Sequence, residues 1–452
     1  MTYGVTQTGG HWGRSIHPSW PDKLVVLSLI TVCPFLGLFM VMTNTNYEGS
    51  VLNSLYALLT CDFFKNIPSY SSYLATILGF FIMFEYLLAL IPDYFSKFLP
   101  NYKGGKQYGQ KTPANHLLEY NINGLQSWVI TNLLFIGFSY LNIIDPAMIA
   151  KNWAQFYIAA NFIGALVTVL AYIKALTFPT YPDDDKYTDC WWYNLVMGIE
   201  FNPRFLNVDI KLFSNGRTGI IAWSIINYSF AAYQYQQFGF VSDSMILVNL
   251  LHMLYIVDFF WNEAWYLKTI DIAHDHYGWY LAWGTFVWLP FCYTLQGSYL
   301  MNHPVILGNT LFYTILVLGI FGYVIFRWTN YQKDYFRRSS NPSNCQIWFQ
   351  PAKYLACQYS TKCGAVHTSN LLLSGFWGMA RHMNYTGDII LSLCYCLACG
   401  FDNLLPYFYV IFMTILLMHR CIRDEDRCSR KYGYNWTIYC QIVQYRLIPG
   451  IF

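Results

Sequence analysis

Four arginines near the end of the sequence recur at a helical spacing, and they are the first residues with evident binding chemistry. The stripe consists of Arg420, Arg423, Arg427 and Arg430. Steps of three, four and three residues place all four on one face of a helix, where Asp424 can pair with Arg420 or Arg427. Arginine binds phosphate through two parallel hydrogen bonds, so the stripe could hold a nucleotide.

A second basic pair, Lys333 and Arg337, follows another apolar stretch at a spacing of four. Spacing alone favours ordinary positively charged anchors at the membrane surface for both patches. The neighbouring residues favour binding, because an anchor needs no stacking faces or amide partners. These residues are Trp377, Arg381, Asn384, Tyr385, Tyr432 and Tyr439. Since no glycine-rich phosphate loop is present, we expect side chains between helices, rather than a Rossmann domain, to hold any nucleotide.

A second group of ionisable residues lies in segment 255–279, within or beside an apolar stretch. It comprises Asp258, Glu263, Lys268, Asp271 and His274. Ionisable groups near hydrocarbon pair with one another or line a cavity. A desolvated carboxyl group can stay protonated and act as an acid. The segment therefore predicts either an acid site or a structural polar network, and the sequence leaves both open.

A metal site is not predicted. His274 and His276 stand beside Asp271 and Asp275, but the other histidines are scattered singly among ten in total. A membrane di-iron site would need several histidine-rich motifs, and no cysteine pair has zinc spacing with a histidine partner. No serine or cysteine nucleophile motif stands out either.

The elements that must position these groups are membrane helices. Of 452 residues, 55% are hydrophobic and 11% are charged, against about 25% charged in soluble domains. A net charge of +3 is too small and too dispersed to indicate a nucleic-acid surface. The thirteen cysteines, an odd number with several in apolar runs, indicate reduced thiols.

Hydropathy and length predict an all-α, polytopic membrane protein with about ten transmembrane helices and a cofactor pocket between the C-terminal ones. The expected spans are 24–43, 73–93, 126–145, 155–176, 217–235, 244–268, 278–296, 305–326, 386–400 and 402–418. Residues 1–23 form a short tail, and 24–452 a single domain whose cofactor part is about 327–452. Basic loops 94–116 and 327–353 and the basic tail are expected to face the cytoplasm.

Two segments resemble the sterol reductase family of the endoplasmic reticulum, and the resemblance extends over nearly the whole chain after the first span. They are Gly198–Arg204 and Met418–Gly433. Four further segments resemble the branch that reduces the C7–C8 double bond of sterol 5,7-dienes. They are Phe213–Arg217, Phe259–Asp271, Thr329–Asp334 and Leu447–Phe452. The C14 branch tends to have Lys-Pro in place of His382 and Met383, whereas Gln444 departs from the usual proline.

The resemblance implies an NADPH site, a sterol drawn from the bilayer, a multi-pass location in the endoplasmic reticulum membrane with the cofactor on the cytoplasmic side, and no nucleic acid. Other membrane enzymes of sterol synthesis are further partners that it allows. The implied cofactor residues are Lys333, Arg337, Leu372, Trp377, Asn384, Tyr385, Asp424, Cys428, Ser429, Arg430, Lys431, Tyr432 and Tyr439.

The chemistry that the resemblance implies is protonation of an alkene followed by hydride transfer, because an isolated C=C has no carbonyl to polarise it. We expect the catalytic groups to be Tyr255, Glu263 and Asp271, with Tyr255 beside a carboxyl group preferred. The expected sterol contacts are Asp258, Tyr266 and His274.

The sequence leaves alternative functions open. A C14 reductase of the same family fits most of the motifs. A membrane isoprenylcysteine-type methyltransferase shares features of the tail, but its S-adenosylmethionine has no phosphate to explain Lys333 and Arg337. A non-catalytic scaffold would be expected to carry a large basic N-terminal region, and a transporter would be expected to show an internal repeat.

Overall fold

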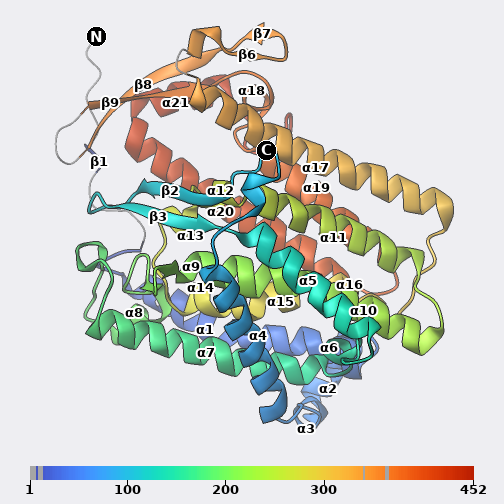
Figure 1. The fold of residues 1–452 in the computed structure, drawn as a ribbon. Helices are drawn as coiled ribbons and strands as arrows, with labels where there is room; N and C mark the ends of the chain where they lie inside the picture. Colours follow the sequence, from blue (N-terminus) through green and yellow to red (C-terminus); the bar gives the residue numbers. More distant parts are fainter. Residues whose placement is uncertain (1–6, 9–13, 340–341, 362–365) are drawn as a thin grey trace. The chain divides into compact units, whose positions relative to one another are not determined.

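The computed structural model describes residues 7–8, 14–339, 342–361 and 366–452, most of them in helices (Figure 1). The chain divides into two compact units. The large unit comprises residues 12–307 and 399–406, and the C-terminal unit comprises 1–11, 308–398 and 407–452. The predicted cofactor part, 327–452, falls in the C-terminal unit apart from 399–406. A single domain over 24–452 stays a prediction.

The large unit is built mainly of helices. They are α1 (Trp20–Asn46), α2 (Val51–Leu59), α3 (Asp62–Lys65), α4 (Ser72–Leu90), α5 (Gly124–Tyr140), α6 (Met148–Lys151), α7 (Trp153–Thr177), α8 (Trp191–Met197), α9 (Ile210–Phe213), α10 (Ala222–Phe238), α11 (Asp243–Trp261), α12 (Glu263–Tyr266), α13 (Ile270–Ala273), α14 (Trp279–Trp283), α15 (Leu289–Cys292) and α16 (Leu295–Leu300). Two π-helical turns, Ser214–Ile221 and Gly284–Trp288, lie before α10 and between α14 and α15.

Local sequence explains where the long helices begin. The hydroxyl of Ser19 accepts a hydrogen bond from the backbone N–H of Asp22, and the Asp22 carboxylate accepts one from the Ser19 N–H. This reciprocal cap, followed by Pro21 in the first turn, fixes the start of α1. Ser71 and Ser242 cap α4 and α11 more simply, because each hydroxyl group accepts one backbone N–H, from Leu74 and Met245 respectively.

Short strands accompany the helices, which corrects the all-α expectation. In the large unit, β2 (Gly105–Lys111) pairs antiparallel with β3 (Leu117–Ile122), and β4 (Arg204–Phe205) with β5 (Val208–Asp209). These strands are short and partly polar, and they carry little of the alternating pattern that identifies a strand in sequence. The fold is therefore mostly helical, with small sheets outside the long helices.

A close approach of two backbones explains the glycine that opens the family-like segment 198–204. Gly198 has φ of +81°, and a Cβ atom added there would collide with the backbone of Tyr277. A Cβ atom added to Gly278 would collide with the backbone nitrogen of Gly198. Lys211 of α9 binds the neighbouring turn at α13, because its ammonium group donates hydrogen bonds to the carbonyls of Asp271, Ile272 and Asp275 at 3.0, 2.8 and 2.8 Å.

Six helical segments in the described ranges are long and apolar enough to cross a membrane. They are Trp20–Asn46, Ser72–Leu90, Trp153–Thr177, Asp243–Trp261, Gly308–Arg338 and Leu405–Tyr432. The four other predicted spans appear as shorter or interrupted helices. Those over 217–235 and 278–296 contain the π-helical turns, and the helices α5 and Met383–Leu397 have 17 and 15 residues. The count of about ten spans stays a prediction.

The C-terminal unit combines long helices with a small sheet. Its helices are α17 (Gly308–Arg338), α18 (Phe376–Met379), α19 (Met383–Leu397), α20 (Phe408–Tyr432) and α21 (Tyr434–Ile442). Its strands are β1 (Gln7–Thr8), β6 (Gln346–Ile347), β7 (Gln350–Pro351), β8 (Tyr354–Thr361) and β9 (Val366–Leu372). β8 pairs antiparallel with β9 and parallel with β1, whereas β6 and β7 form a separate hairpin.

Small residues let α17 and α19 approach closely. A Cβ atom added to Gly387 would collide with the backbone around Gly322 and Phe326, and one added to Gly322 would crowd the Gly387 carbonyl. Such backbone proximity is the usual packing mode of membrane helices. It fixes α19, which carries Asn384 and Tyr385, against α17, which carries Lys333.

Candidate functional site

The basic stripe lies on one unbroken helix, as its spacing predicts. α20 continues to Tyr432 and carries Arg420, Arg423, Arg427 and Arg430. Two of these arginines form ion pairs along the same helix: Arg427 with Asp424, and Arg430 with Asp426 at 2.8 Å. The pairs are partly exposed, and each joins residues only three or four positions apart. A helix surface with exchangeable partners of this kind can present cations to an anionic ligand.

Lys333 of α17 belongs to the same electrostatic neighbourhood. Its ammonium nitrogen lies 4.1 Å from the centroid of the Trp377 ring, and the indole nitrogen of Trp377 donates to the Thr329 carbonyl at 2.8 Å. Asp424 and Arg427 of α20 are close enough to Lys333 to interact with its charge. The structure therefore brings together the two basic patches that the sequence places about ninety residues apart.

The aromatic and amide residues of the predicted cofactor site gather around these cations. Asn384 donates from Nδ2 to Asn330 at 3.2 Å, and Tyr385 stacks on His382 with ring centroids 5.1 Å apart. The Tyr439 hydroxyl donates to the Trp377 carbonyl at 3.5 Å. These contacts join α17, α18, α19 and α21 into one polar and aromatic surface.

The remaining predicted cofactor residues lie in two hydrophobic clusters or on the exposed side of α20. Leu372 packs with Trp377, while Cys428, Tyr432 and Tyr439 pack together. The Lys431 ammonium lies 4.1 Å from the centroid of the Tyr359 ring, and Ser429 is exposed. The structure thus places all thirteen residues in the C-terminal unit; their role in cofactor binding stays a prediction.

A network around Glu425 supports this surface and was missed from the sequence. Glu425 accepts hydrogen bonds from Arg381, with a 2.7 Å ion pair, and from Arg446 at 3.0 Å. Arg381 also donates to the carbonyls of Val443 and Gln444 at 2.6 and 3.0 Å. The three side chains come from positions 21 to 65 residues apart, so no helical spacing could have revealed them. They tie the final segment to the start of α19 and to α20.

In the large unit, Glu263 forms a buried ion pair. Its carboxylate lies 2.7 Å from Arg217, and the two side chains are 0% and 2% exposed. Glu263 also accepts the Gly124 N–H at 2.8 Å, and Arg217 donates to Asn123 at 2.8 Å. Breaking a buried pair leaves an uncompensated charge, so the loss of either side chain would be costly to the fold. The contacts join α5, α12 and the π-helical turn Ser214–Ile221.

Tyr255 and Asp258 lie three residues apart on α11 and share a face of that helix. Tyr255 packs against the Trp223 ring at 5.6 Å in a mostly aromatic surround. Asp258 is buried and accepts from the Asn262 amide at 3.2 Å. A phenol and a carboxyl group therefore share one face of α11, with the phenol ring in an apolar cluster.

The other predicted residues lie around α12 and α13. Tyr266 contacts Phe259 edge-to-face at 5.5 Å and packs with Ile272 in a second hydrophobic cluster. Asp271 is half-buried in α13 and His274 is buried at its end. Burial lowers the pKa of Lys211, which binds this turn, to about 8. Across the described ranges, no three His, Cys, Asp or Glu side chains are grouped as metal ligands.

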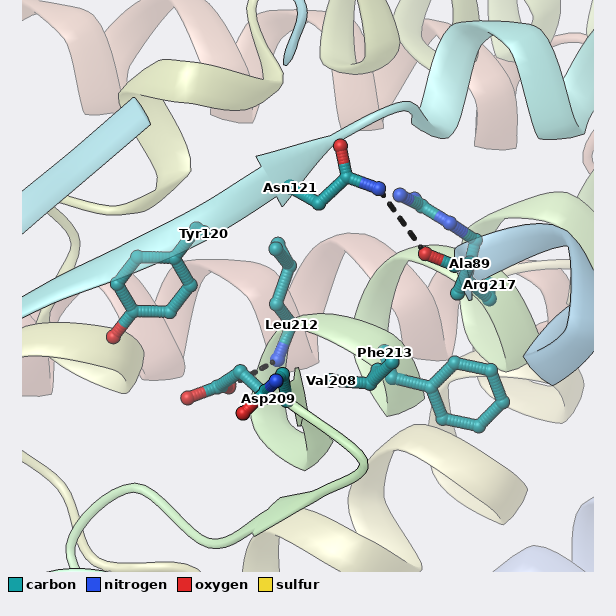
Figure 2. A pocket seen from close by; sticks show the side chains of 9 residues that line it. Ala89, Tyr120, Asn121, Val208, Asp209, Leu212, Phe213 and Arg217 are labelled. Atoms are coloured by element: carbon teal, nitrogen blue, oxygen red, sulfur yellow. Dashed lines mark hydrogen bonds between the residues drawn. The ribbon is translucent and has the colours of Figure 1, made fainter. Parts of the chain in front are cut away.

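A small pocket with polar and apolar lining residues adjoins the Arg217–Glu263 pair and was not predicted (Figure 2). It is lined by Ala89, Tyr120, Asn121, Asn207, Val208, Asp209, Leu212, Phe213 and Arg217. Asn121 donates to the Ala89 carbonyl at 3.2 Å, and Asp209 accepts the Leu212 N–H at 3.0 Å. Its volume of about 40 Å³ suits a few water molecules and is far too small for a sterol.

Comparison with known proteins identifies the family. Residues 39–452 match the model of the Ergosterol biosynthesis ERG4/ERG24 family. The chain is 49% identical over 451 residues to a probable 7-dehydrocholesterol reductase of Acanthamoeba polyphaga mimivirus, covering 99% of each chain. It is 49% identical to the 7-dehydrocholesterol reductase of Danio rerio, covering 98% of this chain and 94% of the relative.

A more distant relative belongs to the C14 branch. The delta(14)-sterol reductase of Dictyostelium discoideum is 39% identical over 353 residues, or 77% of this chain and 73% of its own. The resemblance to sterol reductases is therefore confirmed, and the methyltransferase alternative is not supported. The chain belongs to the ERG4/ERG24 family of membrane sterol reductases.

Proposed function

We propose that this protein is an NADPH-dependent reductase of the C7–C8 double bond in sterol 5,7-dienes, converting substrates of the 7-dehydrocholesterol type into the cholesterol type. The observation that carries this proposal is the 49% identity, over almost the full length of both chains, to relatives named 7-dehydrocholesterol reductase. The delta(14)-sterol reductase match is lower in identity and covers less of the chain.

The C-terminal unit offers groups that fit NADPH. Cations of α17 and α20 suit its phosphates, and the rings of Trp377 and Tyr385 offer stacking faces. Two buried amide atoms beside them, Nε2 of Gln332 and Oδ1 of Asn384, have no hydrogen-bond partner among the described residues. Buried amides normally find partners, so a polar ligand at this surface would satisfy them. When bound, NADPH supplies the hydride.

Within this proposal, Lys333 and Arg337 neutralise phosphate charge while the α20 stripe supplies further cations. Leu372, Cys428, Tyr432 and Tyr439 form the apolar backing. Asp424, held to Arg427, orients that guanidinium and limits how many cations are available at once. The Glu425 network keeps α20 and the start of α19 in fixed positions, because it binds both.

For the proton, we assign Tyr255 as donor to the alkene, with Asp258 as the neighbouring carboxyl group. Both lie on one face of α11, and Tyr255 packs in an apolar cluster. An apolar site would limit access of water, which would otherwise trap a carbocation. Tyr266 and His274 remain the proposed sterol contacts. Glu263 and Asp271 then serve as positioning residues. Glu263 fixes the side chain of Arg217, and Asp271 acts through the turn whose carbonyls Lys211 binds.

The test is a purified protein in lipid nanodiscs supplied with NADPH and 7-dehydrocholesterol. We expect the ultraviolet absorbance of the conjugated diene to disappear and cholesterol to form. NADH and a protein-free nanodisc are the controls. A persistent diene with NADPH, in protein that stays folded and monodisperse, would overturn the proposal.

The C14 reductase alternative is kept because of the partial match to a delta(14)-sterol reductase. A panel of sterols unsaturated at C7, C14 or C24, with product identification by mass spectrometry, separates the branches in one experiment. Reduction of the C14 substrate alone would favour the alternative. We also place the protein in the endoplasmic reticulum membrane with its cofactor site on the cytoplasmic side, which the basic loops support.

A further inference from the structure

The hairpin between β6 and β7 carries two large aromatic residues at its tip, in an unfavourable backbone conformation. Trp348 and Phe349 have φ of +53° and +63°, in the left-handed region that two-residue hairpins usually fill with glycine or asparagine. Phe349 is 97% exposed, and Trp348 is 44% exposed. A strained backbone that carries exposed apolar side chains indicates a surface with a binding role.

α17, in the same unit, carries a continuous exposed stripe that shows where the membrane boundary lies. Its members are Val317, Phe321, Val324, Trp328, Tyr331 and Tyr335. Steps of four, three, four, three and four residues keep them on one face of the helix. The stripe changes from aliphatic and phenyl groups to Trp and Tyr along the helix, the change expected where hydrocarbon meets the headgroup layer.

The length of α17 supports the same boundary. Its 31 residues span about 46 Å, against about 30 Å for the hydrocarbon core, so one end must project from it. The end rich in Lys333, Arg337 and Arg338 is the one that leaves the hydrocarbon. Trp328 therefore lies close to the surface of the bilayer.

Ring contacts place the hairpin tip at the level of Trp328. The Trp328 ring lies 6.3 Å from that of Phe376, and the Phe376 ring lies 5.0 Å from that of Trp348, both edge-to-face. The hairpin and α17 can be followed in Figure 1, where both belong to the orange part of the C-terminal unit. The aromatic series thus runs without interruption from the stripe on α17 to the exposed ring of Phe349.

We propose that the Trp348–Phe349 tip inserts into the interfacial layer of the lipid bilayer and anchors this hairpin to the membrane. Continuity with the lipid-facing stripe of α17 favours phospholipid over a protein partner as the occupant. Insertion of the Phe349 ring would also offset the cost of its left-handed backbone. The hairpin packs against Leu372 and Trp377 through Ile347, so the anchor would steady one side of the proposed cofactor surface.

The direct test replaces Phe349 with the photo-crosslinking residue p-benzoylphenylalanine in the full chain, reconstituted in phosphatidylcholine nanodiscs. After irradiation, we expect a phospholipid adduct at position 349 by mass spectrometry. The same residue in place of Gln358, an exposed position on β8, is the matched control and should give several-fold less lipid adduct. Equal labelling at both positions, or a protein adduct at 349, would overturn the proposal.

A second measurement does not depend on the unnatural residue. Phe349→Trp adds one indole to the 16 native ones, so brominated phospholipids should quench more of its fluorescence than of the wild-type fluorescence. We expect bromine near the headgroup end of the acyl chain to quench the added signal more than bromine near the bilayer centre. No extra quenching by either lipid would place the tip in water and contradict the anchor.

Discussion

The arginine pairs on α20 and the Arg217–Glu263 pair differ in exposure and in sequence separation. In the C-terminal unit, arginines on α20 pair with acids three or four residues away, and Arg427 and Arg430 are about half exposed. In the large unit, Arg217 and Glu263 are 46 residues apart in sequence and almost completely buried. Exposed local pairs are worth little and can exchange partners, whereas a buried pair cannot be opened without a large loss. One arrangement suits ligand binding, and the other suits a fixed scaffold.

The largest effect should follow from breaking the buried pair. Glu263→Gln leaves the Arg217 guanidinium without its counter-charge, and we expect a loss of about 3–5 kcal/mol in the free energy of unfolding. Thermal unfolding in nanodiscs should show a much lower midpoint and poor recovery of folded protein. The double variant Glu263→Gln, Arg217→Met is the control and should recover part of the loss. An unchanged midpoint for the single variant would show that the pair is not structural.

Removal of the proposed proton donor should affect turnover instead. Tyr255→Phe keeps the ring in its aromatic surround and deletes only the hydroxyl group, so we expect kcat for diene reduction to fall by about 10²- to 10⁴-fold. The unfolding midpoint and the affinity for NADPH should stay close to wild type. Tyr266→Phe is the matched control, with a smaller expected loss. Full activity in Tyr255→Phe would remove Tyr255 from the mechanism and shift attention to Asp258.

The sequence predicted patterns within single helices, but it did not predict contacts between distant parts of the chain. Hydropathy and spacing predicted α17, α20 and the arginine stripe, because a helix repeats its own pattern. The Arg217–Glu263 pair was hidden, since it joins residues far apart in sequence through tertiary packing. The Glu425 network was not predicted for the same reason. Tyr359 and Ser369, which contact Lys431 and Tyr432, lie on β8 and β9, whose partly polar sequences gave no clear strand signal.

The interruptions of the predicted spans have a local cause. The π-helical turns Ser214–Ile221 and Gly284–Trp288 contain Gly216, Gly219 and Gly284, which weaken a regular helix. Hydropathy alone predicts continuous apolar spans here, because a hydropathy average over about 20 residues does not detect a break of a few residues. The first of these turns carries Arg217, so a break in the helix supplies the cation for Glu263.

In the C-terminal unit, a single cation should matter for binding rather than folding. Arg337→Ala should raise the KM for NADPH by about 10-fold or more, because a charged hydrogen bond to phosphate contributes about 1.5–3 kcal/mol. The KM for NADH should change less if Arg337 meets the extra phosphate. Arg338→Ala is the matched control, since Arg338 already pairs with Asp334 at 2.7 Å. Equal effects of the two variants would contradict a specific role for Arg337.

The smallest effect should come from loosening an exposed pair. Asp426→Asn removes the carboxylate that holds Arg430 at 2.8 Å, in a pair whose side chains are 53% and 59% exposed. Such pairs contribute about 0–1 kcal/mol, so the unfolding midpoint should hardly move. If the α20 stripe binds phosphate, freeing Arg430 should lower the dissociation constant for NADPH by about 2-fold, and added salt should reduce the gain. Weaker NADPH binding in Asp426→Asn would instead mean that the Arg430–Asp426 pair shapes the binding surface, and so has a structural role like that of the Arg217–Glu263 pair.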